Sequence, residues 1–396
     1  MVEETAALPD VRPADFQNVN RLLTDEERDI RDAVRAFVQD RVLPDVADWF
    51  EAGTLPVRDL GRELGKLGVF GMHLAGADET PASAVAYGLV CMELEAGDSG
   101  VRSFMSVQSS LAMSAISFWG SDEQKAEWLP RLASGEAIGC FGLTEPDTGS
   151  DPGSMRTWAR KDGPDWILHG QKMWITNGSV ADVAVVWART DEGVRGFLVP
   201  RDTPGFTTQD IHKKLSLRAS VTSELLFDDT RLPAAAALPD TSSLRGPLTC
   251  LNNARYGIIW GATGAARACL ESALTYSKER EQFDRPIGAF QIQQQKLAQM
   301  AVEVNRSTLL AYNIGRLKDE SLLRSEHLSM GKLNNVNDAL AVARSARQVL
   351  GGNGITLEYP VIRHMVNLES VVTYEGTADI HSLVVGGALT GIQAFR

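Results

Sequence analysis

Apolar residues recur at helical spacing from about Leu23 to Gly139. Thr24 stands before three acidic residues, as an N-cap stands before the first turn of a helix, and Ser121 repeats that pattern further along. The apolar positions that follow Thr24 fall on one helical face: Ile30, Val34, Phe37 and Val38. We therefore predict an α-helical domain over residues 1–139.

The pattern changes between residues 140 and 240, where short runs of β-branched and aromatic residues alternate with turn-forming clusters. The runs are Trp166–Leu168, Met173–Ile175, Val183–Trp187 and Gly196–Val199. This alternation predicts a middle domain built on an antiparallel sheet, a small barrel or a sandwich.

Helical spacing returns in residues 241–396. Three long segments rich in helix-forming residues each carry an apolar side, and they are Ala265–Arg280, Gln291–Arg316 and Asn334–Leu350. They predict a C-terminal helical bundle. The chain is thus expected to be α+β and mostly α, and the lack of strand–helix alternation argues against a Rossmann-type sheet.

Composition narrows the classes of partner. The 396 residues include 39 basic and 51 acidic side chains, a formal net charge of −12. Such a chain is not expected to bind nucleic acid or anionic membranes, although a local basic pocket can still hold an anionic ligand. The 4 cysteines and 6 histidines lack metal-ligand or CxxC spacing. We therefore expect no metal and a reducing compartment.

The first residues carry no recognisable targeting signal. Met1–Asn20 lacks the apolar core of a signal peptide and the composition of a transit peptide. No run reaches the roughly 18 apolar residues that a membrane helix needs. We expect a cytoplasmic protein without a membrane segment.

Three segments contain residue types that suit a flat, polar ligand. The loop Phe141–Asp151 is dense in hydroxyls and exposable N–H groups, but an interdomain turn explains it as well. Trp174 and Thr176 could stack on and hydrogen-bond a ring, or Trp174 could belong to the core. The glycines of Gln348–Gly354 allow close approach, or simply end a helix.

Two charged residues stand in apolar surroundings. Arg102 lies in the apolar segment Ser99–Gly120, where a buried guanidinium needs an anion. That anion could be a substrate carboxylate or Asp98, one turn earlier. Glu375 follows an apolar run and precedes Gly376, so desolvation would raise its pKa towards that of a general base. A glutamate in a surface turn is the simpler alternative.

Five motifs in a fixed order resemble the acyl-CoA dehydrogenase family and span nearly the whole chain. They are GLTEPDTGSD (142–151), KMWITN (172–177), REQFDRPIGAFQ (280–291), QVLGGNGI (348–355) and TYEGTADI (373–380). Three further segments resemble the glutaryl-CoA dehydrogenases of that family in particular: SVQSSL (106–111), CLNNARYGI (250–258) and TGIQAF (390–395).

The resemblance implies a fold and a cofactor. The fold is an N-terminal helical domain, a middle β-barrel-like domain and a C-terminal four-helix bundle, assembled as a homotetramer. FAD would lie between domains and across a subunit contact, with Arg280, Gln291 and Gln348–Gly352 contributed by a neighbouring subunit. The implied FAD residues are Phe141, Leu143, Thr144, Gly149, Ser150, Trp174, Ile175, Thr176, Arg280, Phe283, Gln291, Gln348, Leu350, Gly351, Gly352, Thr377, Asp379 and Phe395.

The resemblance also implies a reaction. Glu375 would remove the α-proton of an acyl-CoA while a hydride leaves the β-carbon for the flavin. With glutaryl-CoA the product would then lose CO2 to give crotonyl-CoA, and an electron-transferring flavoprotein would take the electrons. Arg102 with Ser103 and Ser106 would hold the distal carboxylate. The full set of implied substrate residues is Glu95, Arg102, Ser103, Ser106, Ser150, Asn252, Asn253, Arg255, Tyr374 and Gly376.

Two positions depart from the glutaryl pattern. Val101 replaces the usual tyrosine before Arg102, and Phe104 replaces a small residue. If Phe104 points into the acyl site, that site is smaller. The alternatives are therefore a dehydrogenase of another short-chain acyl-CoA or dicarboxylyl-CoA without decarboxylation, a flavin oxidase or monooxygenase, and an inactive flavin-binding protein.

Overall fold

The computed structural model describes residues 12–74 and 80–394, and its first helices begin at the caps expected from the sequence. Thr24 and Ser121 each form a capping box with the residue three positions on. The helices are α1 (Asp25–Phe37), α2 (Val46–Ala52), α3 (Val57–Lys66), α4 (Ala84–Gly97), α5 (Ser99–Ser106), α6 (Ser114–Trp119) and α7 (Asp122–Ala133). Two π-helical segments, Val38–Val42 and Val107–Met113, follow α1 and α5.

The middle region is a curled seven-stranded sheet. Its strands are β1 (Gly139–Gly142), β2 (Trp158–Asp162), β3 (Asp165–Thr176), β4 (Val183–Thr190), β5 (Gly193–Pro200), β6 (Phe206–Asp210) and β7 (Thr222–Leu232). They pair in the order β1-β4-β2-β3-β7-β6, and β5 pairs with β4. The sheet is mostly antiparallel as predicted, but β1 runs parallel to β4, and β2 also meets β4 in parallel at Trp158 and Arg189. A parallel pair needs a long connection, which the chain between β1 and β4 supplies.

Strand β3 joins two runs that the sequence pattern left separate, Trp166–Leu168 and Met173–Ile175. Its pairing with β7 shifts register twice, after Leu168 and after Lys172. The second irregularity contains Trp174, whose φ of 64° is left-handed and whose residue surface is 54% exposed. Since a bulge turns a side chain away from its regular direction, Trp174 lies outside the core. The alternative of a core tryptophan is wrong.

The C-terminal region consists of long helices. They are α8 (Arg245–Glu279), α9 (Gln291–Asp319), α10 (Ser325–Val349), α11 (Pro360–Val371) and α12 (Ala378–Thr390), with a short hairpin of β8 (Glu281–Gln282) and β9 (Arg285–Pro286) between α8 and α9. Helix α8 begins 20 residues before the predicted Ala265. Its glycines are contacts rather than breaks, because a Cβ on Gly264 would lie 1.9 Å from the Met92 carbonyl of α4.

Short 3₁₀ turns connect these elements at Pro13–Asp15, Val19–Leu22, Pro152–Ser154, Ala234–Ala236, Ile287–Ala289 and Gly351–Ile355. Within the described ranges, no helix has both the length and the hydropathy needed to cross a membrane.

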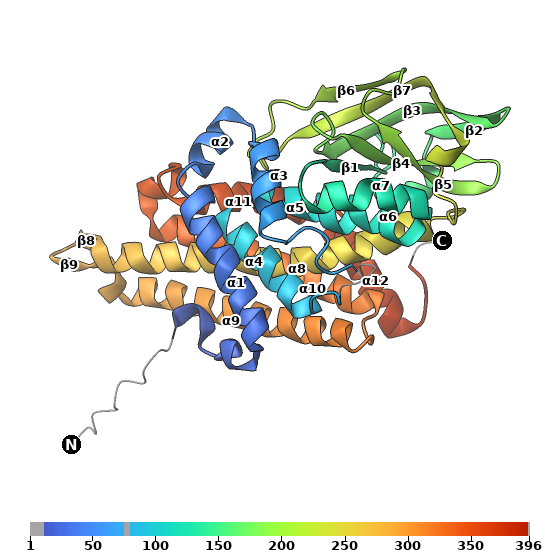
Figure 1. Ribbon diagram of the computed structural model, residues 1–396. Coiled ribbons are helices and arrows are strands. Elements are labelled where there is room, and N and C mark those ends of the chain that lie inside the picture. Colours follow the sequence, from blue (N-terminus) through green and yellow to red (C-terminus); the bar gives the residue numbers. More distant parts are fainter. Residues whose placement is uncertain (1–11, 75–79, 395–396) are drawn as a thin grey trace.

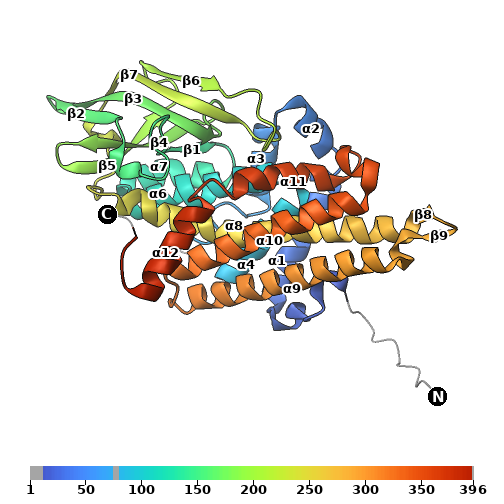
Figure 2. The same cartoon turned by 180° about the vertical axis from the view of Figure 1, so that it is seen from behind.

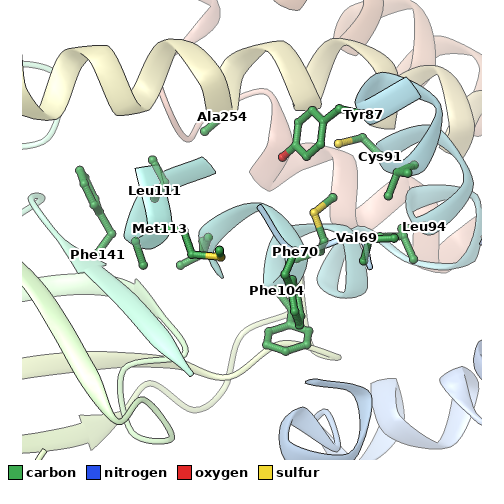
Figure 3. Packing of buried hydrophobic residues seen from close by; sticks show 14 of the residues in the cluster. Val69, Phe70, Tyr87, Cys91, Leu94, Phe104, Leu111, Met113, Phe141 and Ala254 are labelled. Atoms are coloured by element: carbon green, nitrogen blue, oxygen red, sulfur yellow. The ribbon is translucent and has the colours of Figure 1, made fainter. Parts of the chain in front are cut away.

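Helix α8 connects the parts of the molecule. The sheet domain and α12 lie towards one end of α8, and the β8–β9 hairpin projects at the other (Figures 1 and 2). The largest buried cluster joins the N-terminal helices to α8 and to β1. Figure 3 shows part of this cluster, including Phe104 against Phe70, whose rings meet edge to face at 5.7 Å. The expected mostly helical α+β fold with a central sheet domain is confirmed.

Candidate functional site

The predicted base, Glu375, lies in the short connection between α11 and α12. Its φ of 53° and the φ of 100° at Gly376 are both left-handed, which is unusual for a glutamate. Arg255 of α8 donates from Nε to the Glu375 carbonyl at 2.9 Å. The main chain of this turn is therefore fixed from a neighbouring helix.

The Glu375 carboxyl group is poorly solvated. Its Oε2 atom is buried and has no hydrogen-bond partner among the described residues. Burial raises the pKa of Glu375, although nearby Arg102, Lys332 and Arg255 oppose the increase. A desolvated carboxylate with a free oxygen suits proton abstraction, and the alternative of an ordinary surface glutamate does not describe this environment.

Arg102 and Glu95 form a buried ion pair beside this turn. Arg102 Nε donates to Glu95 Oε2 at 2.6 Å, and both side chains are at most 1% exposed. The same guanidinium contacts the hydroxyl of Tyr374, the residue before Glu375. A Cβ on Gly261 would lie 2.0 Å from Glu95 Oε2, so this glycine gives the pair its space against α8.

The alternative in which Arg102 pairs with Asp98 is wrong. Asp98 caps α5 by accepting from Gly100 N at 2.6 Å, and its other oxygen accepts from Arg363 at 2.7 Å and Asn367 at 3.0 Å. Sequence spacing placed Asp98 within reach of Arg102, but the cap turns its carboxylate towards α11. The anion beside Arg102 is Glu95, seven residues away.

Helices α4 and α5, which carry the ion pair, also hold buried polar atoms that lack a partner among the described residues. Glu95 Oε1 and Ser106 Oγ are buried and unpaired within residues 12–74 and 80–394, and Ser103 Oγ lies 3.5 Å from the Tyr374 hydroxyl. Phe104 packs on Phe70 and lies beside Gly61 of α3. Because Phe104 fills the helical core, the condition for a smaller acyl site is not met.

Predicted flavin residues form a first group at the end of the sheet. Met173 N donates to the Thr144 carbonyl at 2.8 Å, so the ends of β1 and β3 lie side by side. Phe141, Leu143 and Ile175 are buried there, while Trp174 exposes its indole. A Cβ on Gly149 would meet open space. An exposed aromatic face beside free hydroxyl and backbone groups, including Ser150 and Thr176, fits a flat heteroaromatic cofactor.

Two further predicted flavin residues begin α12. Thr377 caps this helix by accepting from Ile380 N at 3.2 Å, and the exposed Asp379 lies in its first turn. The helix therefore starts directly after the Glu375 turn and presents its positive N-terminal pole there.

A second group lies at the hairpin end of α8. It comprises Arg280, Phe283, Gln291, Gln348, Leu350, Gly351 and Gly352, of which Leu350 is buried and Phe283 is 87% exposed. Asn353 Nδ2 donates to Tyr276 Oη at 3.1 Å, which joins the α10 end to α8 near Arg280. At about 1.5 Å per residue, Arg280 lies roughly 37 Å along the helix from Arg255. One chain therefore does not bring both groups together. The remaining predicted residue, Phe395, lies outside the described residues.

The predicted CoA residues are partly engaged within the chain. Asn252 Oδ1 accepts from Arg255 at 3.0 Å, and Asn253 Oδ1 accepts from Lys318 at 2.7 Å. Their contact with CoA stays a prediction.

Sequence reasoning missed Lys332. This residue of α10 is 1% exposed and donates to the carbonyls of Tyr374 and Gly376, each at 2.8 Å. Its spacing held a signal, because Leu328, Lys332 and Val336 share one helical face and the two neighbours are buried.

Three family models cover most of the chain. They describe the acyl-CoA dehydrogenase N-terminal domain at residues 24–136, the middle domain at 140–230 and the C-terminal domain at 245–390. The bovine (Bos taurus) mitochondrial short-chain specific acyl-CoA dehydrogenase is 36% identical over 96% of this chain and 93% of its own length.

Solved structures agree with the family models. Glutaryl-CoA dehydrogenase from Mycobacterium smegmatis matches with a TM-score of 0.95 and 63% identity, covering 97% of this chain and 99% of that one. A glutaryl-CoA dehydrogenase from the same organism in complex with FADH2 matches with the same TM-score and coverage at 60% identity, which agrees with the expected FAD. This chain belongs to the acyl-CoA dehydrogenase family.

Proposed function

We propose that this enzyme dehydrogenates a dicarboxylyl-CoA thioester at the α,β-position and that glutaryl-CoA is its preferred substrate. The observation that carries the proposal is the buried guanidinium of Arg102, joined to the base turn through Tyr374. Arginine binds carboxylates well in apolar surroundings, so a distal carboxylate fits beside it. The 63% identical glutaryl-CoA dehydrogenase supports the same substrate.

The residues of this chain act on the proton and on the position of the thioester. Glu375 takes the α-proton as the α,β double bond forms, and FAD supplies the acceptor for the hydride that leaves the β-carbon. Loss of the γ-carboxylate as CO2 then leaves an electron pair on the acyl chain. The protonated Glu375 returns its proton to the γ-carbon, which yields crotonyl-CoA and restores the carboxylate.

A neighbouring copy of the chain completes the cofactor site in this proposal. The two groups of predicted flavin residues lie at opposite ends of α8, so a single chain cannot place both against one FAD (Figure 2). Closed homo-oligomers bring such distant surfaces together, and a homotetramer satisfies this need. We expect an electron-transferring flavoprotein to reoxidise the enzyme. The four cysteines are all free and buried, which fits the cytoplasm.

A second candidate is a monocarboxylic short-chain acyl-CoA. Glu95 already neutralises Arg102 without any substrate, and this is the observation that supports the monocarboxylic alternative. The bovine short-chain relative is 36% identical. The two candidates assign different roles to Arg102, so an Arg102 variant can distinguish them.

The test is anaerobic flavin reduction with glutaryl-CoA and butyryl-CoA, in the wild type and in Arg102→Ala. We expect the substitution to weaken glutaryl-CoA turnover by about 10- to 100-fold, because a hydrogen bond to a charged group contributes about 1.5–3 kcal/mol. Butyryl-CoA turnover should change by less than about 3-fold at a pH well above the pKa of Glu375, which Arg102 lowers. Equal losses with both substrates would remove the carboxylate role. Release of CO2 from glutaryl-CoA tests the decarboxylation separately.

A further inference from the structure

Three consecutive carbonyls in the Glu375 turn accept hydrogen bonds from two cationic side chains, of which Lys332 is buried and Arg255 is partly buried. Lys332 Nζ donates to Tyr374 O and to Gly376 O, each at 2.8 Å. Arg255 Nε donates to Glu375 O at 2.9 Å. The first residue comes from α10 and the second from α8, so the turn is held on both sides.

Burying the Lys332 amine costs free energy, and packing in the core does not require a lysine at this position. Its ammonium group lies on the buried face of α10, and no ion-pair partner for it is present in the part of the chain that the structure describes. Burial lowers the pKa of Lys332. An apolar side chain would suit this face better, so the two carbonyls of the turn are the reason for a lysine.

The turn needs such support. Glu375 and Gly376 both have left-handed φ, and a Cβ on Gly376 would lie 2.8 Å from His381 Nε2. A glutamate adopts this backbone only where its surroundings impose it. Without the amine, the carbonyls of Tyr374 and Gly376 lose these hydrogen bonds. The turn can then change its conformation, and the Glu375 carboxylate can point away from the substrate.

We propose that Lys332 is a positioning residue for the catalytic base, fixing the left-handed turn that directs the Glu375 carboxylate at the substrate. The inference rests on the proposed function, since it takes Glu375 as the base. Either charge state of the amine can donate both hydrogen bonds. The positioning role therefore persists when Lys332 loses its proton.

Charge adds a second, measurable effect. Positive charge at Lys332 lowers the pKa of Glu375, so removing it raises that pKa further. The acid limb of the pH profile for flavin reduction then moves to higher pH. The other titratable groups that face the turn stay in place: Glu95 of α4, Arg102 of α5, Arg255 of α8, Tyr374 and His381 of α12.

The experiment compares flavin reduction in the FAD-loaded wild type, Lys332→Met and Lys332→Arg. We expect Lys332→Met to slow reduction at saturating thioester by at least 30-fold, with the bound-flavin spectrum intact and the thioester Kd within 3-fold. The acid limb should move to higher pH. Lys332→Arg keeps a cationic donor. The logarithm of its rate should therefore recover at least a third of the decrease seen in Lys332→Met.

Lys214 offers a matched control. Its Nζ donates to the carbonyls of Leu217 and Ser220 at 2.9 and 2.8 Å, in a loop outside the proposed site. Lys214→Met should leave the rate within 3-fold. Equal slowing in Lys214→Met and Lys332→Met, or a wild-type rate and pH profile in Lys332→Met, would overturn the inference. If Lys332→Met does not fold, Lys332→Gln replaces it with the same criteria.

The Glu375→Gln variant separates the two levels of the proposal. Normal flavin reduction in Glu375→Gln would refute the base itself and with it the proposed function. If Glu375→Gln does not reduce its flavin but Lys332→Met does so at the wild-type rate, only the positioning role is refuted.

Discussion

Glu375 combines a left-handed main chain with a carboxyl oxygen that is buried and, among the described residues, unpaired. The two properties belong together, because a group that must accept a proton cannot have its acceptor atom occupied. Burial raises the pKa, while Arg102, Lys332 and Arg255 keep the increase in check. The residue therefore stays a base instead of a permanently protonated acid.

The pH dependence of the wild type follows from this pKa. Only the deprotonated carboxylate abstracts a proton, so flavin reduction should fall as the pH falls through the raised pKa of Glu375. We expect the rate at saturating thioester to rise with pH across that pKa. Rapid-mixing experiments between about pH 5 and pH 9 measure this profile. A rate that increased on acidification would contradict the assignment of Glu375 as the base.

Residue identities in the site were largely readable from the sequence, but their partners were not. Glu375 and Arg102 stood out because charged residues interrupt apolar runs. The partner of Arg102 depended on how α4 and α5 meet, and the cap formed by Asp98 decided it in favour of Glu95. The helical spacing of Lys332 indicated that it is buried, but its partners could not be predicted because main-chain carbonyls are not distinguished in the sequence.

At the scale of elements, a π-helical segment joins the helical domain to the sheet. Gln108 in Val107–Met113 accepts from Gly139 N at 2.7 Å and donates to the carbonyls of Leu132 and Ala137 at 2.9 and 2.8 Å. All three of these hydrogen bonds join the Gln108 side chain to main-chain groups between the end of α7 and the start of β1. The widened helical turn thus sets where β1 begins and where Phe141 lies.

We predict that Gln108→Leu lowers the free energy of unfolding by about 3 kcal/mol, because it leaves buried main-chain groups unpaired. Chemical denaturation monitored by circular dichroism measures the change. Gln209→Leu on the exposed strand β6 is the matched control and should stay within about 0.5 kcal/mol. A loss for Gln108→Leu no larger than that of the control would contradict the anchoring role.

Glu93 ties three helices together. It accepts from Arg35 of α1 at 2.8 Å and from Arg267 of α8 at 2.6 Å, while its own helix is α4. Burial alone would raise the pKa of Glu93, but the two arginines lower it to about 2. The stability that this ion pair network contributes is therefore complete above the ordinary glutamate pKa and is lost as the pH falls towards 2.

We predict that Glu93→Gln destabilises the protein by about 3 kcal/mol near neutral pH, because two partly buried arginines lose their buried counter-charge. The difference between variant and wild type should shrink as the pH falls from about 4.5 towards 2. Thermal denaturation at several pH values tests this dependence, with the exposed Glu127→Gln as control. A difference that stayed constant with pH would show that packing, not charge, is responsible.

Elements were predicted unevenly for physical reasons. The capped helices α1 and α7 were found because capping boxes are local in sequence. Helix α8 was truncated because its glycines look like breaks until α4 packs against them. The unity of β3 was missed because its irregularities interrupt the strand pattern at Trp174. In each missed case the deciding contact lies far away along the chain.

At the scale of the whole molecule, the predicted flavin residues fall into two groups separated by the length of α8 (Figure 1). We predict that Arg280→Ala and Glu375→Gln chains are each inactive alone and complement each other when coexpressed. If each site takes its base from one chain and Arg280 from a neighbour, random mixing gives intact sites in about one quarter of cases.

The measurement is turnover per chain of the purified mixture, with mixed assemblies selected by two different affinity tags. A coexpressed mixture of Glu375→Gln with Lys332→Met serves as the control, since Lys332 contacts the Glu375 turn of its own chain. That pair should restore much less activity. If the first mixture recovers no activity, the two groups of residues do not share one cofactor site between neighbouring chains.

The exposed Phe283 hairpin has a consequence for assemblies that mix damaged and intact chains. Under the proposed sharing, a chain with a damaged hairpin keeps its own base turn and loses nothing of its own fold, yet it withholds a contact from another chain's cofactor. The cofactor site that is damaged therefore belongs to a chain without the mutation. In an equal mixture with wild-type chains, a damaged hairpin and a damaged Glu375 would each leave about half of the sites intact, but only the hairpin lesion would inactivate the base turn of an undamaged chain.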